Sequence, residues 1–356
     1  MALMEITTNI ACRVQCDFCP HEMIIEEYSN RTKSNNISYG QPAQMSFEIF
    51  KQCLEKLPKS VKIAFSGYSE PFLNPDCSKM IRYAHERGFT IQLYSTLVGM
   101  KLEDIDKFKH IPFDMFHIHL ADSSNHAKIA VNKYYLDLLK KILTLIPNVT
   151  SMSMGNLHPK IKEIVDTETG SSLMISRAGN LENVKHVQKK MGPITCNRMT
   201  TFDLIDKLDE NVLLPNGDVA LCCNDYGLQN ILGNLTEIDY DEIFTGKVYR
   251  EIFQKIKSEG QDVICRHCEE AIPDSELKNK QDIQRKFKTD KNAFELIQLY
   301  KVHLERFPDE EGFKAYYSRL VNDRISLTDI ENEIKKSHEY QSGHNLQLKL
   351  KNNVIV

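Results

Sequence analysis

The sequence predicts an α/β fold that consists of a partial (β/α)6 TIM-like barrel, a small cysteine-rich domain and a C-terminal helical module. Up to about residue 185, short β-rich runs alternate with amphipathic helical stretches, which is the pattern of βα units around a parallel sheet. Cysteines are then spread over residues 190–273, and helical patterns without β-rich runs follow. The predicted domains are therefore 1–189, 190–273 and 275–343, with a flexible tail over 344–356.

Six runs in the first region have the composition of β-strands, and helical patterns with an apolar residue every three or four positions lie between them. The predicted strands are Met4–Thr8, Lys62–Ser66, Thr90–Ser95, Met115–Leu120, Thr150–Met154 and Ser172–Ser176. The helical patterns between them include Phe47–Leu57, Cys77–Glu86 and Lys133–Leu145. Because a closed TIM barrel needs eight such units, we expect an incomplete barrel.

The later elements follow from turn and helix signals. An Asn216-Gly217 step between two β-like runs predicts a hairpin turn inside the cysteine-rich segment. A charged stretch, Asp274–Lys291, leads into the helical patterns Ala293–Arg306, Glu310–Val321 and Leu327–Ser337.

Composition excludes several functional classes. Lys and Arg (45) nearly balance Asp and Glu (49), and no long basic run is present, so nucleic acid is not an expected partner. The strand-like run from Leu3 to Thr8 leaves no room for a signal peptide, and no apolar run reaches membrane-spanning length. We therefore expect a cytoplasmic protein that does not contact a membrane.

The ten cysteines are expected to be metal ligands or reactive thiols, because cytosolic reductants keep thiols out of disulfides. They fall into a group of three (Cys12, Cys16, Cys19), a group of four (Cys196, Cys222, Cys265, Cys268) and three others (Cys53, Cys77, Cys223).

The first group has the spacing Cys12-x-x-x-Cys16-x-x-Cys19 and directly follows the first predicted strand, so its loop belongs to the mouth of the barrel where such folds carry their chemistry. Three cysteines on one short loop can bind three irons of a [4Fe-4S] cluster and leave the fourth iron open. A zinc site would need a fourth ligand, for which His21 is the nearest candidate, and it remains the alternative.

The segment "MEITTNIACRVQCDFCP" resembles the first strand and cysteine loop of the radical S-adenosylmethionine (SAM) superfamily, whose hallmark is this spacing. The resemblance implies that SAM chelates the open iron and that Phe18 lies near its adenine. It also implies that one electron, from a reductant such as flavodoxin or ferredoxin, cleaves SAM to a 5'-deoxyadenosyl radical that abstracts a hydrogen atom from an unactivated carbon.

Two further segments match that family. Gly67-Tyr68-Ser69-Glu70 resembles its Gly-Gly-Glu segment, which holds the SAM ammonium, although Tyr68 and Ser69 replace the commoner small residues. Ser95-Thr96 corresponds to the position that contacts the ribose. Without the resemblance, these would be ordinary loop residues.

Asp122 and Arg177 both fall at strand ends on the presumed catalytic face, and we predict catalytic roles for them. The alternatives are a turn or helix cap for Asp122 and an ion pair for Arg177. His117 and His119 alternate along a strand, and we expect a structural role for both.

The second group supplies four thiolates, enough to occupy every iron of another [4Fe-4S] cluster. The text "LLPNGDVALCCND", with Gly217 five residues before Cys222, resembles the twitch form of the SPASM domain. The resemblance implies an auxiliary cluster that accepts an electron from the substrate. A zinc site with four cysteine ligands is the alternative, and Cys223 could replace Cys222 as a ligand.

Residues Phe294–Tyr340 resemble a helical domain of unknown function that recurs in bacterial proteins linked to surface polysaccharides. We expect this module to dock other proteins and to carry no catalytic residue.

Together these features predict a radical SAM oxidoreductase that dehydrogenates a small polyol, amino sugar or cyclitol. With the first strand beginning near Met4, no leader-peptide recognition domain is expected before the barrel, so modification of a ribosomally made peptide is the alternative. A non-catalytic iron–sulfur or zinc scaffold is the third hypothesis.

Overall fold

The computed structural model describes residues 2–165, 170–171, 175–182, 184, 187–202, 205–287, 290–304, 308–323 and 325–341. The chain divides into two compact units. The first contains Met1–Lys189 and Cys196–Ala271, and the second contains Lys190–Thr195 and Ile272–Val356. The predicted tail, 344–356, lies outside the described residues.

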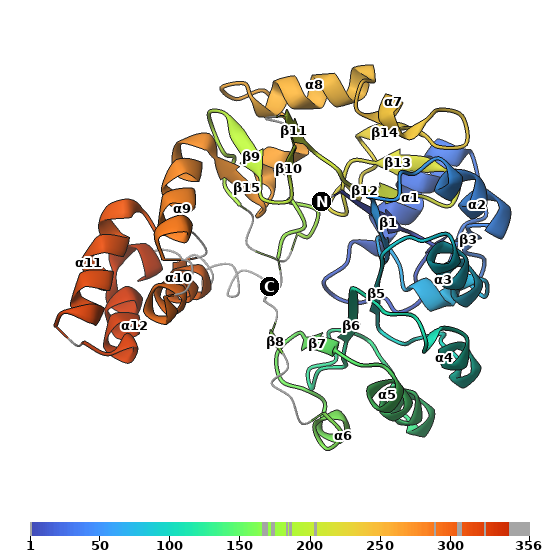
Figure 1. Ribbon diagram of the computed structural model, residues 1–356, viewed down its shortest axis with the longest axis horizontal. Coiled ribbons are helices and arrows are strands. Elements are labelled where there is room, and N and C mark those ends of the chain that lie inside the picture. The colour runs from blue at the N-terminus through green and yellow to red at the C-terminus, as the bar shows by residue number, and fades with distance from the viewer. Residues whose placement is uncertain are drawn as a thin grey trace, which may run out of the picture. The chain divides into compact units, whose positions relative to one another are not determined.

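Within the described residues, a nine-stranded sheet of order β14-β13-β12-β1-β4-β5-β6-β7-β8 forms the centre of the first unit (Figure 1). Its strands are β1 (Leu3–Ile6), β4 (Lys62–Phe65), β5 (Ile91–Ser95), β6 (Met115–His119), β7 (Val149–Ser153), β8 (Gly170–Ser171), β12 (Glu210–Leu213), β13 (Asp218–Ala220) and β14 (Ile231–Asn234). The short strands outside it are β2 (Asn9–Ile10), β3 (Ala43–Gln44), β9 (Ile194–Cys196), β10 (Thr200–Phe202), β11 (Ile205–Lys207) and β15 (Ala271–Pro273).

In this sheet β1, β4, β5, β6, β7 and β8 are parallel neighbours in that order, which confirms the predicted partial barrel. The helices between them are α1 (His21–Thr32), α2 (Phe47–Glu55), η1 (Pro71–Leu73), α3 (Cys77–Glu86), α4 (Leu102–Phe108), α5 (Lys133–Leu145) and α6 (Pro159–Lys162). The first five predicted strands are confirmed to within two residues at each end, and two of the three predicted helices are confirmed residue for residue. The sixth predicted strand falls partly on 172–174, which lie outside the described residues.

Apolar and polar side chains alternate along the strands. Successive side chains of a strand point to opposite sides of the sheet, so the apolar ones gather on one face and the polar ones on the other. On β1, Met4 and Ile6 are fully buried, whereas Glu5 faces a cavity. On β5, Leu93 is fully buried, whereas Gln92 lines the same cavity. The sheet therefore has one apolar face and one polar face that lines the cavity.

The cysteine-rich segment continues this sheet, because β12 pairs in parallel with β1 and then turns back into β13. The predicted hairpin turn is confirmed at Gly217, where φ is +90° and a Cβ atom would lie 2.6 Å from the Thr236 side chain. Only glycine fits such a position without strain. Helices α7 (Tyr240–Ile243), α8 (Lys247–Ile256) and η2 (Ile264–His267) follow β14.

One buried arginine fixes the turn that carries Cys265 and Cys268. Arg266 has no exposed surface. Its guanidinium donates to the carbonyl oxygens of Lys255 (2.8 Å), Ser258 (2.5 Å) and Gln261 (2.8 Å), at and beyond the end of α8. Arg266 therefore ties the end of α8 to the residues that follow it.

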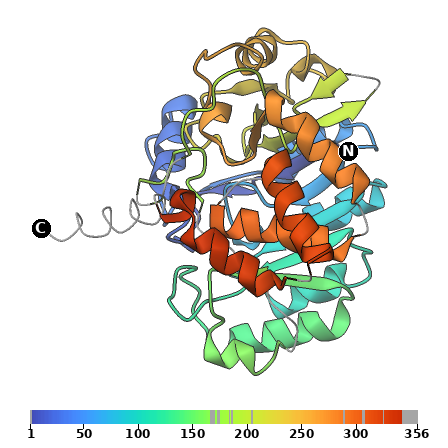
Figure 2. The ribbon, with the colours of Figure 1, turned by 90° about the vertical axis from the view of Figure 1, so that its left-hand side faces the viewer.

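The second unit is helical, with α9 (Asp274–Lys286), α10 (Lys291–Leu304), α11 (Glu310–Val321) and α12 (Leu327–Lys336). Helix α10 packs against α11 and α12, and Figure 2 shows the three together. The fully buried core of this second unit includes Leu296, Phe313, Ile330 and Ile334. Helix α9 occupies most of the stretch that the sequence marked only as charged. No helix among the described residues is long and apolar enough to span a membrane.

We predict that Arg266→Met lowers the free energy of unfolding by about 3 kcal/mol, because it removes charge-assisted hydrogen bonds to three partly buried carbonyl oxygens. Urea unfolding under anaerobic conditions, followed by circular dichroism, measures the change. Arg82→Met is the matched control, since Arg82 is half exposed and its partner is Glu86 on the same helix. Equal urea midpoints for Arg266→Met and Arg82→Met would contradict the prediction.

Candidate functional site

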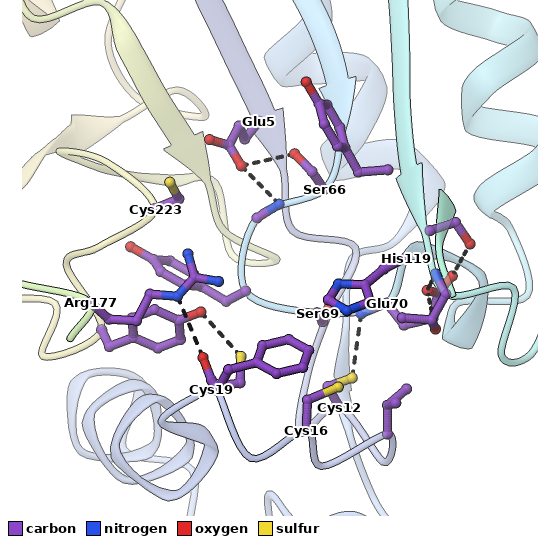
Figure 3. Close-up of a pocket in the computed structure, with 18 of the residues that line it drawn as sticks. Glu5, Cys12, Cys16, Cys19, Ser66, Ser69, Glu70, His119, Arg177 and Cys223 are labelled. Atoms are coloured by element: carbon purple, nitrogen blue, oxygen red, sulfur yellow. Dashed lines mark hydrogen bonds between the residues drawn. The ribbon is translucent and has the colours of Figure 1, made fainter. Parts of the chain in front are cut away.

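A cavity of about 840 Å³ opens at the polar face of the sheet in the first unit. Figure 3 shows Cys12, Cys16 and Cys19 on one side of it and Glu5 and Cys223 on the other. The predicted site residues that line this cavity are Cys12, Cys16, Phe18, Cys19, Gly67, Tyr68, Ser69, Glu70, Ser95, Thr96 and Arg177. The structure therefore brings together residues from four separate segments of the sequence.

The three loop cysteines are largely buried, and burial raises the pKa of each thiol, that of Cys12 to about 11. Cys12 Sγ accepts a hydrogen bond from the backbone N–H of Glu70 at 3.4 Å. Buried thiols of this kind must lose their protons to bind metal, and a cluster supplies the compensating charge. The His21 ring is engaged elsewhere, with Nε2 2.9 Å from the carbonyl oxygen of Cys16.

Among the described residues, no group of three or more His, Cys, Asp or Glu side chains is arranged to hold a single metal ion. A [4Fe-4S] cluster makes a different demand, because each cysteine binds a different iron and the sulfur atoms stand farther apart.

Glu70 organises the neighbouring strand end. Its carboxylate accepts from Ser95 Oγ (2.8 Å), from the Thr96 N–H (2.6 Å) and hydroxyl (2.7 Å), and from the Phe72 N–H (3.2 Å). Burial raises the pKa of Glu70, while these donors oppose the shift. The carboxylate therefore fixes the Ser95-Thr96 segment against the Gly67–Glu70 loop.

The rings of Phe18 and His119 stack on each other beside the cysteines. Their rings are parallel, with centroids 4.7 Å apart. Burial lowers the pKa of His119 to about 4, so its ring is neutral near pH 7. His119 Nε2 and Ser69 Oγ are buried without a hydrogen-bond partner among the described residues, and both side chains line the cavity. Such orphaned polar atoms fit a site that binds a polar ligand.

The two predicted catalytic residues lie in different places. Arg177 lines the cavity, and its Nε donates to the carbonyl oxygen of Phe18 at 3.5 Å. Asp122 is not among the lining residues, and its carboxylate accepts from the N–H groups of His126 and Ala127, both at 3.0 Å. Asp122 therefore shapes a turn, and His126 of that turn accepts through its carbonyl oxygen from the N–H of Asp17 in the cysteine loop.

The wall opposite the cysteine loop contains charged residues that the sequence did not single out. Arg198 Nη1 lies 3.2 Å from Cys223 Sγ and 3.7 Å from a carboxylate oxygen of Glu210. Glu5 accepts from the Gly67 N–H at 3.0 Å. None of these residues belongs to a recognisable spacing pattern. Only the alternation along β1 could have indicated that Glu5 faces inward.

A second, smaller cavity of about 40 Å³ lies behind this wall. It is lined by all four cysteines of the second group, Cys196, Cys222, Cys265 and Cys268. Cys268 Sγ accepts from Asn224 Nδ2 and from the Glu270 N–H, both at 3.4 Å. Cys222 lines only this smaller cavity, whereas Cys223, Arg198 and Glu210 line both cavities.

Two tyrosines join the two groups of cysteines, and the sequence indicated neither link. Tyr68 donates its hydroxyl to the carbonyl oxygen of Cys222 at 2.7 Å. The Tyr226 hydroxyl lies 3.2 Å from Cys19 Sγ.

Comparison with known proteins agrees with this arrangement. The family model of the radical SAM superfamily matches residues 6–168, and that of SPASM, an iron–sulfur cluster-binding domain, matches residues 208–269. The first of these domains implies a [4Fe-4S] cluster and SAM, and the second implies an auxiliary iron–sulfur cluster.

Solved structures with a similar fold share little sequence with this chain. BtrN in complex with AdoMet and 2-DOIA is 15% identical, with a TM-score of 0.49, and the match covers 73% of this chain and 88% of BtrN. Native anSMEcpe with bound AdoMet is 13% identical, with a TM-score of 0.46 and coverages of 75% and 85%. Streptococcus suis SuiB bound to precursor peptide SuiA is 11% identical, with a TM-score of 0.49 and coverages of 75% and 69%. On the family models, the chain belongs to the radical SAM superfamily and carries a SPASM iron–sulfur cluster-binding domain.

Proposed function

We propose that this chain is a radical SAM oxidoreductase that dehydrogenates a small polyol, amino sugar or cyclitol, with the auxiliary cluster accepting the electron. One observation carries the proposal: the cavity lined by the loop cysteines shares a wall, formed by Cys223, Arg198 and Glu210, with the second cysteine-lined cavity. A substrate in the larger cavity would therefore lie between the two cofactor sites.

The cysteines divide between two clusters in this proposal. Cys12, Cys16 and Cys19 hold the cluster that binds SAM, and Cys196, Cys222, Cys265 and Cys268 hold the auxiliary cluster. When bound, the first cluster and SAM supply a radical able to remove a hydrogen atom from an unactivated carbon. Cys222 is the better fourth ligand than Cys223, because it lines only the second cavity.

The remaining predicted cofactor contacts surround the loop cysteines. Phe18, stacked on His119, offers an apolar ring face to the adenine. Glu70 acts by holding the Ser95 and Thr96 hydroxyls in place, since its carboxylate already accepts from four donors. The hydroxyl of Ser69 remains available for a polar group of SAM.

The lining of the cavity supports a small polar substrate. Closed TIM barrels fill their interior with branched apolar side chains. Here Glu5, Lys62, Gln92 and Tyr94 occupy inward positions instead, and they suit hydroxyl or amino groups. The volume of about 840 Å³ is in the usual range for small-molecule sites. Arg177, beside the cysteine loop, is the proposed substrate contact.

Loss of two hydrogens from an alcohol also requires a proton acceptor, because the substrate gives up one hydrogen atom, one electron and one proton. The carboxylates of Glu5 and Glu210 line the large cavity, Glu210 on the wall shared with the auxiliary site, and can take the proton. Burial raises the pKa of Glu210, which makes it a better proton acceptor than an exposed carboxylate.

An anaerobic metabolite screen for substrate-dependent formation of 5'-deoxyadenosine tests the function. Flavodoxin or ferredoxin supplies the electron, and iron and sulfide analysis is expected to give about two [4Fe-4S] clusters per chain. A response to peptides and none to polyols or amino sugars would favour the alternative, peptide modification. One zinc and no iron would refute the enzyme proposal.

We predict that replacing Cys12, Cys16 and Cys19 together with Ala abolishes reductive SAM cleavage and removes about half of the iron, because the auxiliary ligands belong to another segment. Iron analysis and the remaining absorbance of the auxiliary cluster measure the result. Loss of both clusters would contradict the assignment of separate ligand sets.

We predict that Glu70→Gln weakens SAM binding about tenfold with the first cluster intact, because an amide nitrogen cannot accept from Ser95 or Thr96. Anaerobic titration calorimetry measures the affinity. Glu86→Gln, on the exposed side of α3, is the control. An unchanged affinity would remove Glu70 from the SAM site.

We predict that Cys265→Ala together with Cys268→Ala spares SAM cleavage by dithionite-reduced protein but stops formation of oxidised product. The first cluster keeps its ligands, whereas the substrate radical has no electron acceptor. Chromatography of 5'-deoxyadenosine and product separates the two steps. Folding is checked by circular dichroism, because loss of metal ligands can unfold a small domain. A folded double variant with full product formation would refute the electron-acceptor role.

A further inference from the structure

Tyr226 belongs to the loop of the auxiliary cysteines but contacts the other cysteine group. It lies four residues after Cys222, and its hydroxyl is 3.2 Å from Cys19 Sγ. The side chain is almost fully buried, with 2% of its surface exposed. Its ring packs edge-on against Tyr68 with centroids 4.8 Å apart. Burial and this ring contact therefore hold the hydroxyl in place beside Cys19.

The direction of this hydrogen bond follows from chemistry. A thiolate bound to iron has no proton and can only accept, whereas a phenol carries its proton at neutral pH. Tyr226 must therefore be the donor once Cys19 binds a cluster. The Arg177 guanidinium also lies near the Cys19 sulfur and adds positive charge there. Cys12, by contrast, accepts from a backbone N–H.

The loop that positions Tyr226 is fixed at two points. The Asp225 carboxylate accepts from the N–H groups of Gln229 (3.1 Å) and Asn230 (2.9 Å). The Tyr68 hydroxyl donates to the carbonyl oxygen of Cys222 at 2.7 Å and lies 3.1 Å from that of Asp225. Tyr226 therefore cannot shift without moving Cys222, and the Gly67–Glu70 loop restrains both through Tyr68.

Hydrogen bonds to the sulfur atoms help to set the reduction potential of an iron–sulfur cluster. A donor to a thiolate favours the reduced state, because that state carries the more negative charge. We propose that Tyr226 is a positioning residue that acts through Cys19 to raise the reduction potential of the SAM-binding cluster, so that the auxiliary-cluster loop sets how readily this cluster is reduced. The inference rests on the proposed assignment of Cys12, Cys16 and Cys19 as cluster ligands.

The test is an EPR-monitored redox titration of the intact protein with both clusters. The signal that changes on addition of SAM identifies the first cluster. In Tyr226→Phe we expect a roughly tenfold lower ratio of reduced to oxidised cluster at a fixed potential, equivalent to about 59 mV for a one-electron couple. Tyr83→Phe is the matched control, because its hydroxyl bonds Glu55 at the surface, and no shift is expected.

Tyr68→Phe tests the link through the loop, since it keeps the ring and removes only the hydroxyl. We expect a smaller shift in the same direction, and the Tyr68→Phe, Tyr226→Phe double variant should shift no further than Tyr226→Phe alone. If the double variant shifted the reduction potential by the sum of the two single shifts, the coupling through the loop would be refuted.

Failure of the inference differs from failure of the proposed function. A fully loaded Tyr226→Phe protein with the wild-type potential would overturn the role of Tyr226 and leave the function standing. Wild-type protein that binds no cluster at the loop cysteines would refute the function, and the inference with it.

Discussion

The pairing of β1 on both of its edges is the constraint on which the site depends. β1 bonds to β4 on one side and to β12 on the other, both in parallel. The ends of parallel neighbours lie at one edge of a sheet, so the cysteine loop that follows β1 meets the Gly67–Glu70 loop that follows β4. The hairpin after β12 returns as β13, antiparallel to β12, and Cys223 beyond β13 lines the same cavity. One strand thus brings three distant segments of the sequence to a single cavity.

The polar face of the sheet shows how an open barrel accommodates charge. A buried charge is costly unless it is paired or hydrogen-bonded. Lys62 pairs with Asp114 at 2.6 Å, and Gln92 donates to the same carboxylate at 2.7 Å. Arg198 is similarly placed among Glu210, Glu270 and Cys223. The charges that line the cavity therefore have partners before any substrate arrives.

Sequence reasoning recovered what is encoded locally and missed what folding brings together. The spacing of Cys12, Cys16 and Cys19 lies within eight residues, and strand periodicity placed their loop correctly. Helix α9 has few apolar residues, so its sequence lacks the periodic pattern that would predict a helix. Tyr68 stands out in the sequence only as a departure from the family pattern, since its partner Cys222 lies far along the chain. Arg198 and Tyr226 gave no signal, because their importance comes entirely from contacts across the cavity.

The parallel partnership of β1 with β12 also bears on how the protein is made. Ribosomal synthesis produces Leu3–Ile6 long before Glu210–Leu213, so one edge of the sheet must stay open until the cysteine-rich segment emerges. Open strand edges promote aggregation, and contacts between distant segments form slowly. The cysteine-rich segment therefore protects one edge of the sheet as well as lining the cavity.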